Sequence, residues 1–416
     1  MPALVRSVLL GLFLLSRSID LALLALNLRE AFQARGVPPA MRGLIPRRQA
    51  ERARRYAVAR GRHALAHGLA DAVVTAWLLF GGALPWLDRS LATAGVAGAH
   101  RFVAFLALTS LALGLVEWPF AWWRARAVEQ PFGFGEVRLV PFLAARVRAL
   151  AGRAALALPL LYAAWAILAS AGWAWWLWLF AALAVLQLAL QWAWPALLAS
   201  RLARARPVTG GPLPERLEAL SAAAGFRTGG VFVVGGSRFP GHANACLVGL
   251  FRPRVLIDDR LLARLSVEAV AAVTAHEMGH FLLRHPLQRL AATMLGTFAL
   301  LALTAVVLSW PPLYQAFGFG APSPEAAVAL VTLAAGPLAF WLTPLVSAWS
   351  RRQELAADAF SARLFGRVGA LASALQRLSD DNLANPWPHT WYAAWRFRHP
   401  PLAERLVALV RAAGSR

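Results

Sequence analysis

The chain has 416 residues, of which 59% are hydrophobic and only 15% are charged. Soluble domains carry about a quarter charged residues and fewer than half apolar ones. The composition therefore excludes an ordinary soluble enzyme and predicts a polytopic membrane protein. The formal net charge is +22, and the sequence has no lysine, so every basic side chain is an arginine. The single cysteine, Cys246, excludes an internal disulfide framework.

Seven apolar stretches reach the length of about 18 to 20 residues that a membrane-spanning helix needs. They occupy residues 7–27, 64–86, 102–123, 154–172, 174–199, 290–310 and 326–349. They divide the chain into four segments. We expect a membrane domain with five spans at 1–199, a protease insertion at 200–289, spans six and seven at 290–349, and a C-terminal segment at 350–416.

The arginines predict the orientation of these spans. Residues 28–63 hold ten arginines, whereas residues 87–101 hold two and residues 311–325 hold none. Residues 124–153 hold six, and ten follow from residue 350 onward. Arginine is enriched in cytoplasmic loops, so this alternation predicts an N-terminus outside and a C-terminus in the cytoplasm. Because the arginines follow the spans and no recognition module is visible, we expect no nucleic-acid partner.

Four charged residues fall inside the predicted spans, namely Arg17, Asp20, Asp71 and Glu117. Charges at bilayer depth are costly and face a bundle interior or a wet cavity. Two interpretations follow from the sequence. Arg17 and Asp20 are three residues apart and can neutralise each other on one helix face, or the four groups line a hydrated chamber between the spans.

The insertion contains a pattern with a chemical meaning. It begins with an amphipathic helix at 212–225 and continues with β-type stretches at 230–234 and 244–257. Ser266 then starts a helix that carries residues 276–280 (HEMGH). Residues four apart share a helix face, so His276 and His280 can both bind one zinc ion. Glu277 can then take a proton from a water that the metal activates.

A hydrolytic zinc ion needs a third protein ligand and one open position. Glu354 and Asp358, directly after the seventh span, are also four residues apart. We expect Glu354 to bind the metal and Asp358 to fix a zinc-bound histidine by a hydrogen bond. The alternative is a solvated helix face that pairs with Arg351 and Arg352. Both motifs lie on the predicted cytoplasmic side, which favours a shared metal site over the solvated face. We expect one zinc ion per chain.

With these motifs the chain resembles the type I CAAX prenyl endopeptidases, also called a-factor-converting proteases, which are integral-membrane zinc metalloproteases of the gluzincin type. Besides the two zinc motifs, the similarity rests on five short segments, namely residues 27–30 (NLRE), 129–134 (EQPFGF), 241–245 (GHANA), 381–383 (DNL) and 399–405 (HPPLAER). The resemblance implies a mainly α fold. It would have seven transmembrane helices, a large intramembrane chamber and a small α+β zinc protease domain on the cytoplasmic side.

The resemblance also implies roles for further residues. Glu277 is the general base, and His399 and Arg405 stabilise the oxyanion of the tetrahedral intermediate, where fixed donors are useful. For His399, a polar cap before Pro400 is the alternative. Asn244 and Asn382 are implied to bind substrate, Asn244 on a strand that pairs with an extended peptide. An ordinary turn asparagine is the alternative for Asn244.

Together these observations predict a membrane-embedded zinc endopeptidase that cleaves membrane-associated or C-terminally prenylated substrates. The arginine-only, tryptophan-rich sequence is typical of a GC-rich bacterium, so we expect the bacterial inner membrane, where prenylated proteins are not expected. A heat-shock-type quality-control protease is one alternative. A non-catalytic membrane scaffold or transporter with a structural zinc site is another, although a structural site does not need a base such as Glu277.

Overall fold

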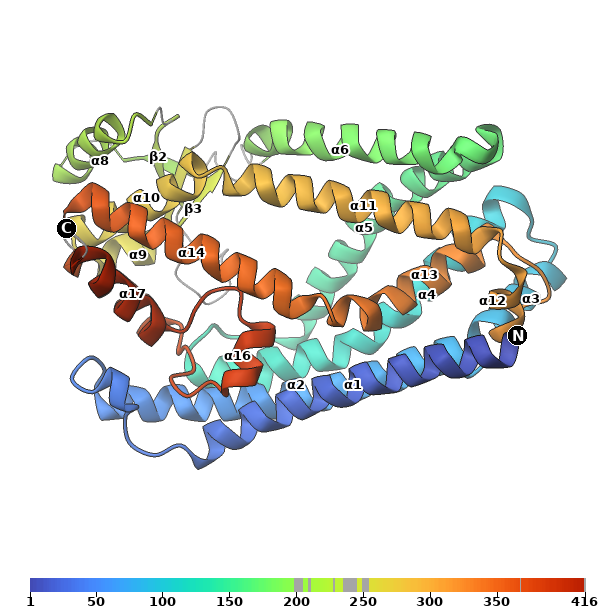
Figure 1. Cartoon of the computed structure of the whole chain (residues 1–416), viewed down its shortest axis with the longest axis horizontal. Helices are drawn as coiled ribbons and strands as arrows, with labels where there is room; N and C mark the ends of the chain where they lie inside the picture. Colours follow the sequence, from blue (N-terminus) through green and yellow to red (C-terminus); the bar gives the residue numbers. More distant parts are fainter. Residues whose placement is uncertain are drawn as a thin grey trace.

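The computed structural model describes residues 1–197, 205–208, 211–226, 229–234, 245–248, 254–366 and 368–414. Long helices run along the molecule, and a smaller mixed domain lies at one end (Figure 1). The long helices are α1 (Pro2–Gln33), α2 (Arg47–Phe80), α4 (Gly98–Trp123), α5 (Leu139–Ser170), α6 (Trp175–Leu197), α11 (His285–Leu308), α13 (Pro324–Phe340) and α14 (Thr343–Phe365).

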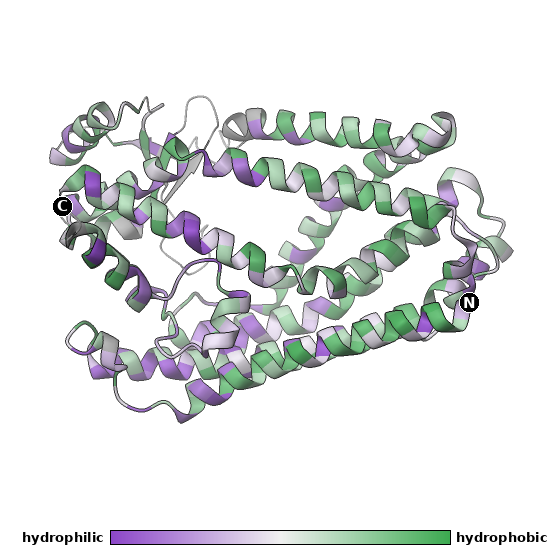
Figure 2. Ribbon diagram, in the orientation of Figure 1, coloured by the Kyte–Doolittle hydropathy of each residue, from purple (hydrophilic) through white to green (hydrophobic). Residues whose placement is uncertain are grey.

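Six of these helices are long and apolar enough to cross a membrane, and α13 and α14 form a seventh candidate that is bent by 63°. The predicted count of seven is therefore reached only with a broken last span. The chain termini lie at opposite ends of the molecule (Figure 1), as an odd number of crossings requires. Hydrophobic residues cover the long helices, whereas hydrophilic residues gather at the end that holds the mixed domain (Figure 2).

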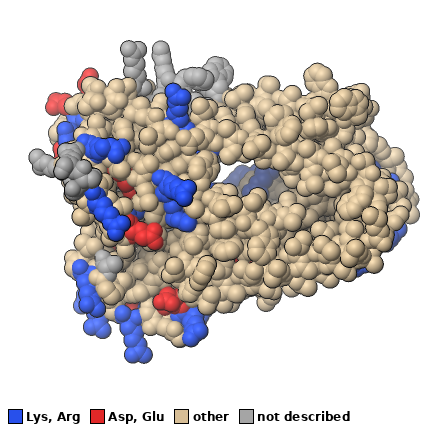
Figure 3. Space-filling view, viewed as in Figure 1, with Lys and Arg blue, Asp and Glu red and all other residues tan. Residues whose placement is uncertain are grey.

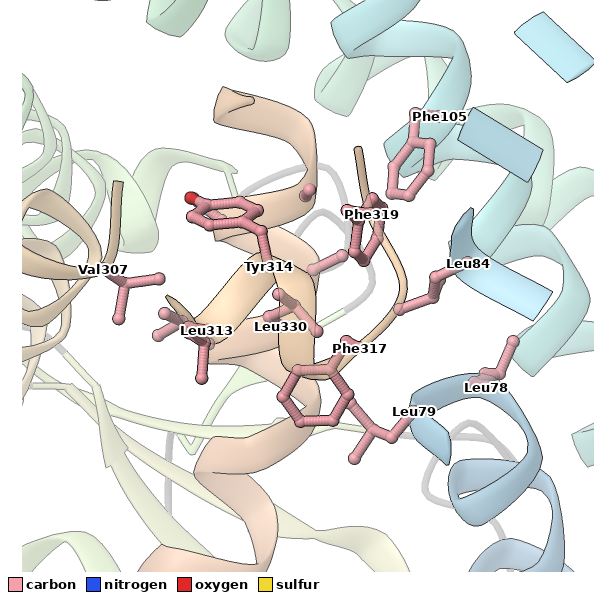
Figure 4. Close-up of a cluster of buried hydrophobic side chains, with 14 of the residues drawn as sticks. Leu78, Leu79, Leu84, Phe105, Val307, Leu313, Tyr314, Phe317, Phe319 and Leu330 are labelled. Carbon is pink, nitrogen blue, oxygen red and sulfur yellow. The ribbon is translucent and has the colours of Figure 1, made fainter. Parts of the chain in front are cut away.

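Short elements connect the spans. They are η1 (Pro39–Met41), α3 (Ala83–Thr93), the π-helical η2 (Arg124–Glu129), η3 (Gln130–Phe132), η4 (Gly172–Ala174) and α12 (Pro311–Ala316). At the end of the bundle where the chain begins, α3 and α12 pack against α2, α4 and α13. Tyr314, Phe105 and Leu84 are almost completely buried there (Figure 4). Close packing of such side chains holds neighbouring helices together, so this cluster fixes the helices at the end far from the mixed domain.

The charges inside the spans pair between helices that are distant in sequence. Arg17 of α1 donates a 2.7 Å hydrogen bond to Asp71 of α2, and Asp20 pairs with Arg396 of the C-terminal segment. Glu117 of α4 lies 2.7 Å from His67 of α2. Of the two interpretations of these charges, the pairing of Arg17 with Asp20 is therefore wrong. Both residues find partners on neighbouring elements, which the spacing within α1 cannot reveal.

Within its described residues, the mixed domain contains a four-stranded sheet with the strand order β1-β2-β4-β3. Its elements are β1 (Ala205–Pro207), α8 (Pro212–Ala223), β2 (Val231–Val234), β3 (Ala245–Val248), β4 (Arg254–Asp258), α9 (Asp259–Arg264) and α10 (Val267–Leu282). Strands β2 and β4 are parallel, and the other two pairs are antiparallel. The single stretch expected at 244–257 is thus two strands, β3 and β4.

One side of this sheet packs on two helices. Leu213, Leu217 and Leu220 of α8 share a buried cluster with Val255 and Ile257 of β4 and Val270 of α10. The amphipathic helix predicted at 212–225 is confirmed. The C-terminal elements α15 (Gly369–Asp381), α16 (Thr390–Arg396) and α17 (Leu402–Gly414) complete the domain. Its core holds α10 in place, and the division of the chain into four segments stays a prediction.

Candidate metal centre

The metal-site helix is α10. The Ser266 side chain accepts a hydrogen bond from the Ala269 backbone N–H, so it is the predicted N-cap. Alanine residues on successive turns of α10 are buried against α14 and α15. A side chain at Gly279 would approach Phe360 of α14 to 3.1 Å, so glycine permits close packing of the two helices. The buried Ser361 hydroxyl, which donates to the Ala272 carbonyl, ties α14 to α10.

This packing brings the three predicted ligands together. The ligand atoms of His276, His280 and Glu354 all lie within 4.8 Å of one another. Glu354 Oε2 is 3.6 Å from His276 Nε2, and Glu354 Oε1 is 3.4 Å from His280 Nε2. Glu354 is only 2% exposed. Two imidazoles and a carboxylate converging in this way are the donor set of a catalytic zinc site, so the residues fit a metal ion.

Asp358 supports this group from behind. It is 1% exposed, and its Oδ1 lies 2.8 Å from His276 Nδ1. Arg405 of α17 donates two hydrogen bonds to the same carboxylate, from Nε at 2.8 Å and from Nη2 at 2.7 Å. The alternative of a solvated face that pairs with arginines of its own helix is wrong. Arg351 instead donates to backbone carbonyls of α16 and of Phe397.

His280 has a neighbour that the sequence analysis missed. His285 is buried, and its Nδ1 lies 2.8 Å from His280 Nδ1. The chain leaves α10 after Leu282, passes through Arg284 at a φ of 58°, and begins α11 at His285. This turn places a residue five positions after His280 against its ring. The signal in the sequence is Pro286, since a proline ends or kinks a helix and the chain can then return on itself.

The site is electrostatically asymmetric. Burial lowers the pKa of His276, but the carboxylates of Asp358 and Glu354 outweigh this effect and raise its pKa to about 9. Glu277, the next residue along α10, is partly exposed. Burial raises the pKa of its carboxyl group above the ordinary value, although the nearby histidines oppose the shift. A carboxyl group of raised pKa beside a metal-ligand set has the chemistry of a general base.

His399 lies at the exposed side of the same group. Its Nδ1 is 2.9 Å from Glu354 Oε2, and its side chain is 70% exposed. It also lines a cavity of about 520 Å³ that extends toward α1 and α2. The structure therefore brings seven predicted or neighbouring polar residues to one place. They are His276, Glu277, His280, His285, Glu354, Asp358 and His399.

Of the two predicted substrate residues, only Asn382 belongs to the part of the chain that the structure describes. Asn244 falls outside the described residues. Asn382 follows α15 as its C-cap, and its backbone N–H donates to the Leu378 carbonyl. Ser379 and Leu383, on either side of it, line the 520 Å³ cavity. The substrate-binding roles of Asn244 and Asn382 stay predictions.

The fold and the site define an integral, multi-pass membrane protein with a metallopeptidase centre. The comparisons agree with this class. A family model described as the N-terminal part of CAAX prenyl proteases, with five membrane helices, matches residues 27–200. The model of peptidase family M48 matches residues 208–413. The chain belongs to peptidase family M48, in its CAAX prenyl protease branch, and is a metalloprotease that acts on a peptide or protein substrate.

Individual relatives cover nearly the same length. The CAAX prenyl protease 1 homolog of Oryza sativa is 28% identical and covers 90% of each chain. The human homolog is also 28% identical and covers 90% of this chain and 88% of its own. The crystal structure of Ste24p from S. mikatae superposes with a TM-score of 0.87 at 22% identity, over 97% of this chain and 98% of that chain. This likeness confirms the predicted fold.

Proposed function

We propose that this protein is a zinc endopeptidase that cleaves peptide bonds of membrane-associated or C-terminally prenylated, CAAX-type substrates. The observation that carries the proposal is the convergence of His276, His280 and Glu354 within 4.8 Å, beside a cavity that reaches between the spans. A bound zinc ion would supply Lewis-acid chemistry to the scissile carbonyl and the attacking water. The names of the relatives support the substrate class.

In this proposal the protein residues divide the work. Glu277 takes the proton from the attacking water and later returns it to the leaving amine. Asp358 holds the ring of His276, and His285 holds the ring of His280. The His280 Nδ1–H donates to His285 Nδ1 and thereby leaves His280 Nε2 free for the metal. Glu277 is therefore the catalytic residue of this group, whereas Asp358 and His285 are positioning residues.

The geometry separates the roles of His399 and Arg405. His399 is exposed beside Glu354, where its ring would donate to the developing oxyanion of the substrate carbonyl. Arg405 donates two hydrogen bonds to the buried carboxylate of Asp358. We therefore assign His399 to the oxyanion and revise Arg405 to a positioning residue that acts through Asp358.

The arginine pattern supports an N-terminus outside and a C-terminus in the cytoplasm of a bacterial inner membrane. Basic side chains crowd the end that carries the mixed domain, whereas the middle of the visible face is nearly free of charge (Figure 3). The metal centre would then open to the cytoplasmic leaflet, where a membrane-anchored peptide can reach it.

The test of the substrate class is cleavage of matched peptides by purified wild-type protein. One peptide carries a prenylated cysteine, the second carries the same sequence without the lipid, and the third is an unrelated membrane-protein segment. Preferential cleavage of the prenylated peptide supports the CAAX-type assignment. Preference for the membrane-protein segment would replace it with the quality-control role. Zinc binding without cleavage of any peptide would favour a structural site.

A further inference from the structure

A second, strongly basic cavity lies among α1, α2, η2 and α16. Its volume is about 410 Å³, and its charged lining consists of four arginines and only two aspartates. Charges at this depth face a wet cavity rather than lipid. The excess of positive charge predicts an anionic ligand.

Three of the four arginines already have carboxylate partners. Arg17 pairs with Asp71, Arg396 with Asp20, and Arg124 with Glu129. Within the part of the chain that the structure describes, Arg60 makes no ion pair. Its guanidinium carbon lies 5.4 Å from the centroid of the Tyr56 ring, a cation–π contact that leaves its hydrogen-bond donors free. Arg60 is therefore the cation that an incoming anion can engage.

Arg60 also connects this cavity with the metal centre. It lines both the 410 Å³ cavity and the 520 Å³ cavity, as do Tyr392 and Arg396. The 520 Å³ cavity extends to His399, whose Nδ1 lies 2.9 Å from the metal-ligand candidate Glu354. A continuous hollow thus leads from the metal centre to Arg60. A peptide with its scissile bond at the metal can extend one of its ends along this hollow.

We propose that Arg60 binds the free C-terminal carboxylate of the substrate and so selects peptides that end shortly after the scissile bond. A guanidinium can hold a carboxylate by two parallel hydrogen bonds. A lipid phosphate is the other anion of suitable charge. The hollow joins Arg60 to the metal centre, however, and this continuity favours the tail of a peptide bound there. This inference rests on the proposed function, because it assumes that the chain cleaves peptides at that centre.

The experiment compares a fluorogenic peptide acid with the same peptide as its C-terminal amide. Wild-type protein should cleave the acid with a kcat/KM at least about tenfold higher, since a charged hydrogen bond contributes about 1.5–3 kcal/mol. In Arg60→Gln, kcat/KM for the peptide acid should fall to the value for the amide, mostly through a higher KM. The value for the amide should stay that of the wild type. The unchanged amide rate also shows that the variant is folded.

The matched control is Arg62→Gln, which removes the same charge from the exposed surface of the same helix and lines neither cavity. It should keep the acid preference. Equal cleavage of acid and amide by the wild type would overturn the inference and leave the proposed function standing. An acid preference that survives Arg60→Gln would overturn it too. Failure to cleave either peptide would overturn the proposed function itself.

A last arm separates the peptide from lipid. The wild type and Arg60→Gln are assayed with the amide in vesicles of phosphatidylcholine, with and without phosphatidylglycerol. The inference predicts the same response of both proteins to the anionic lipid. An effect of phosphatidylglycerol that Arg60→Gln abolishes would assign the cavity to lipid phosphate and overturn the carboxylate assignment.

Discussion

Arg405 holds the buried carboxylate of Asp358 by two hydrogen bonds, of 2.8 Å and 2.7 Å, and the same carboxylate lies 2.8 Å from His276. The C-terminal helix α17 is thereby linked to the metal ligand through a single side chain. The metal centre consequently depends on three segments that are far apart in the sequence, namely α10, α14 and α17.

Arg405→Ala should weaken metal binding without removing a ligand. It leaves the buried Asp358 carboxylate without its guanidinium partner and with only His276 beside it, and removing one partner of a buried ion pair costs up to about 3–5 kcal/mol of folding free energy. Loss of such an outer partner also costs about 10–100-fold in metal affinity. Competition with a chelator measures the affinity, and thermal unfolding measures the stability. Arg411→Ala, on the exposed surface of α17, is the control. Wild-type metal affinity in Arg405→Ala would contradict the link.

His285→Phe should reduce metal affinity by about 10–100-fold, because the partner that fixes the His280 ring is lost. His285→Asn supplies a side-chain oxygen that can accept a hydrogen bond, so we expect it to recover part of the affinity. A chelator titration of the three proteins makes the comparison. If the phenylalanine variant binds metal as tightly as the wild type, the 2.8 Å contact has no positioning role.

Metal binding should depend on pH up to about pH 9. The raised pKa of His276 keeps its imidazole protonated below that value in the metal-free protein, and only the neutral imidazole binds a metal. Apparent affinity should therefore rise about tenfold per pH unit through the neutral range, with release of one proton from this group. Calorimetry in buffers of different ionisation enthalpy counts the protons. A plateau of affinity near pH 7 would indicate an unshifted histidine.

The membrane pair Arg17–Asp71 should behave as a unit. Arg17→Ala leaves a carboxylate at bilayer depth, and one uncompensated charge there costs about 2.5–3.5 kcal/mol. Arg17→Ala combined with Asp71→Ala removes both charges and should restore much of the lost thermal stability in detergent. A double variant that is less stable than either single variant would show that the two residues do not act as a pair.

Most of the metal centre could be predicted from the sequence, because its key residues are close together along the chain. His276 and His280, and likewise Glu354 and Asp358, are four residues apart on single helices, so their shared faces follow from helix geometry. His285 was missed because it is five residues from His280 and returns to it only through the left-handed turn at Arg284. The partners of Arg17 and Asp20 depend on helix packing, which spacing along one helix does not contain.

The same division applies to the fold. Hydropathy predicts the apolar stretches, but it does not report the 63° bend between α13 and α14. The bend matters for the site, because it directs α14 toward α10, and α14 carries Glu354. The chain end at α17 could be connected with the site only through the resemblance, since no local pattern pairs Arg405 with Asp358.

The most direct test of the account compares wild-type protein with Glu277→Gln, each loaded with zinc and analysed for metal content. The glutamine keeps the shape of the side chain but cannot accept the proton from water. We predict about one zinc ion per chain in both proteins, and a rate of peptide cleavage that falls by about 10²–10⁴-fold in the variant. Cleavage by Glu277→Gln at the wild-type rate, with zinc bound, would contradict the central claim.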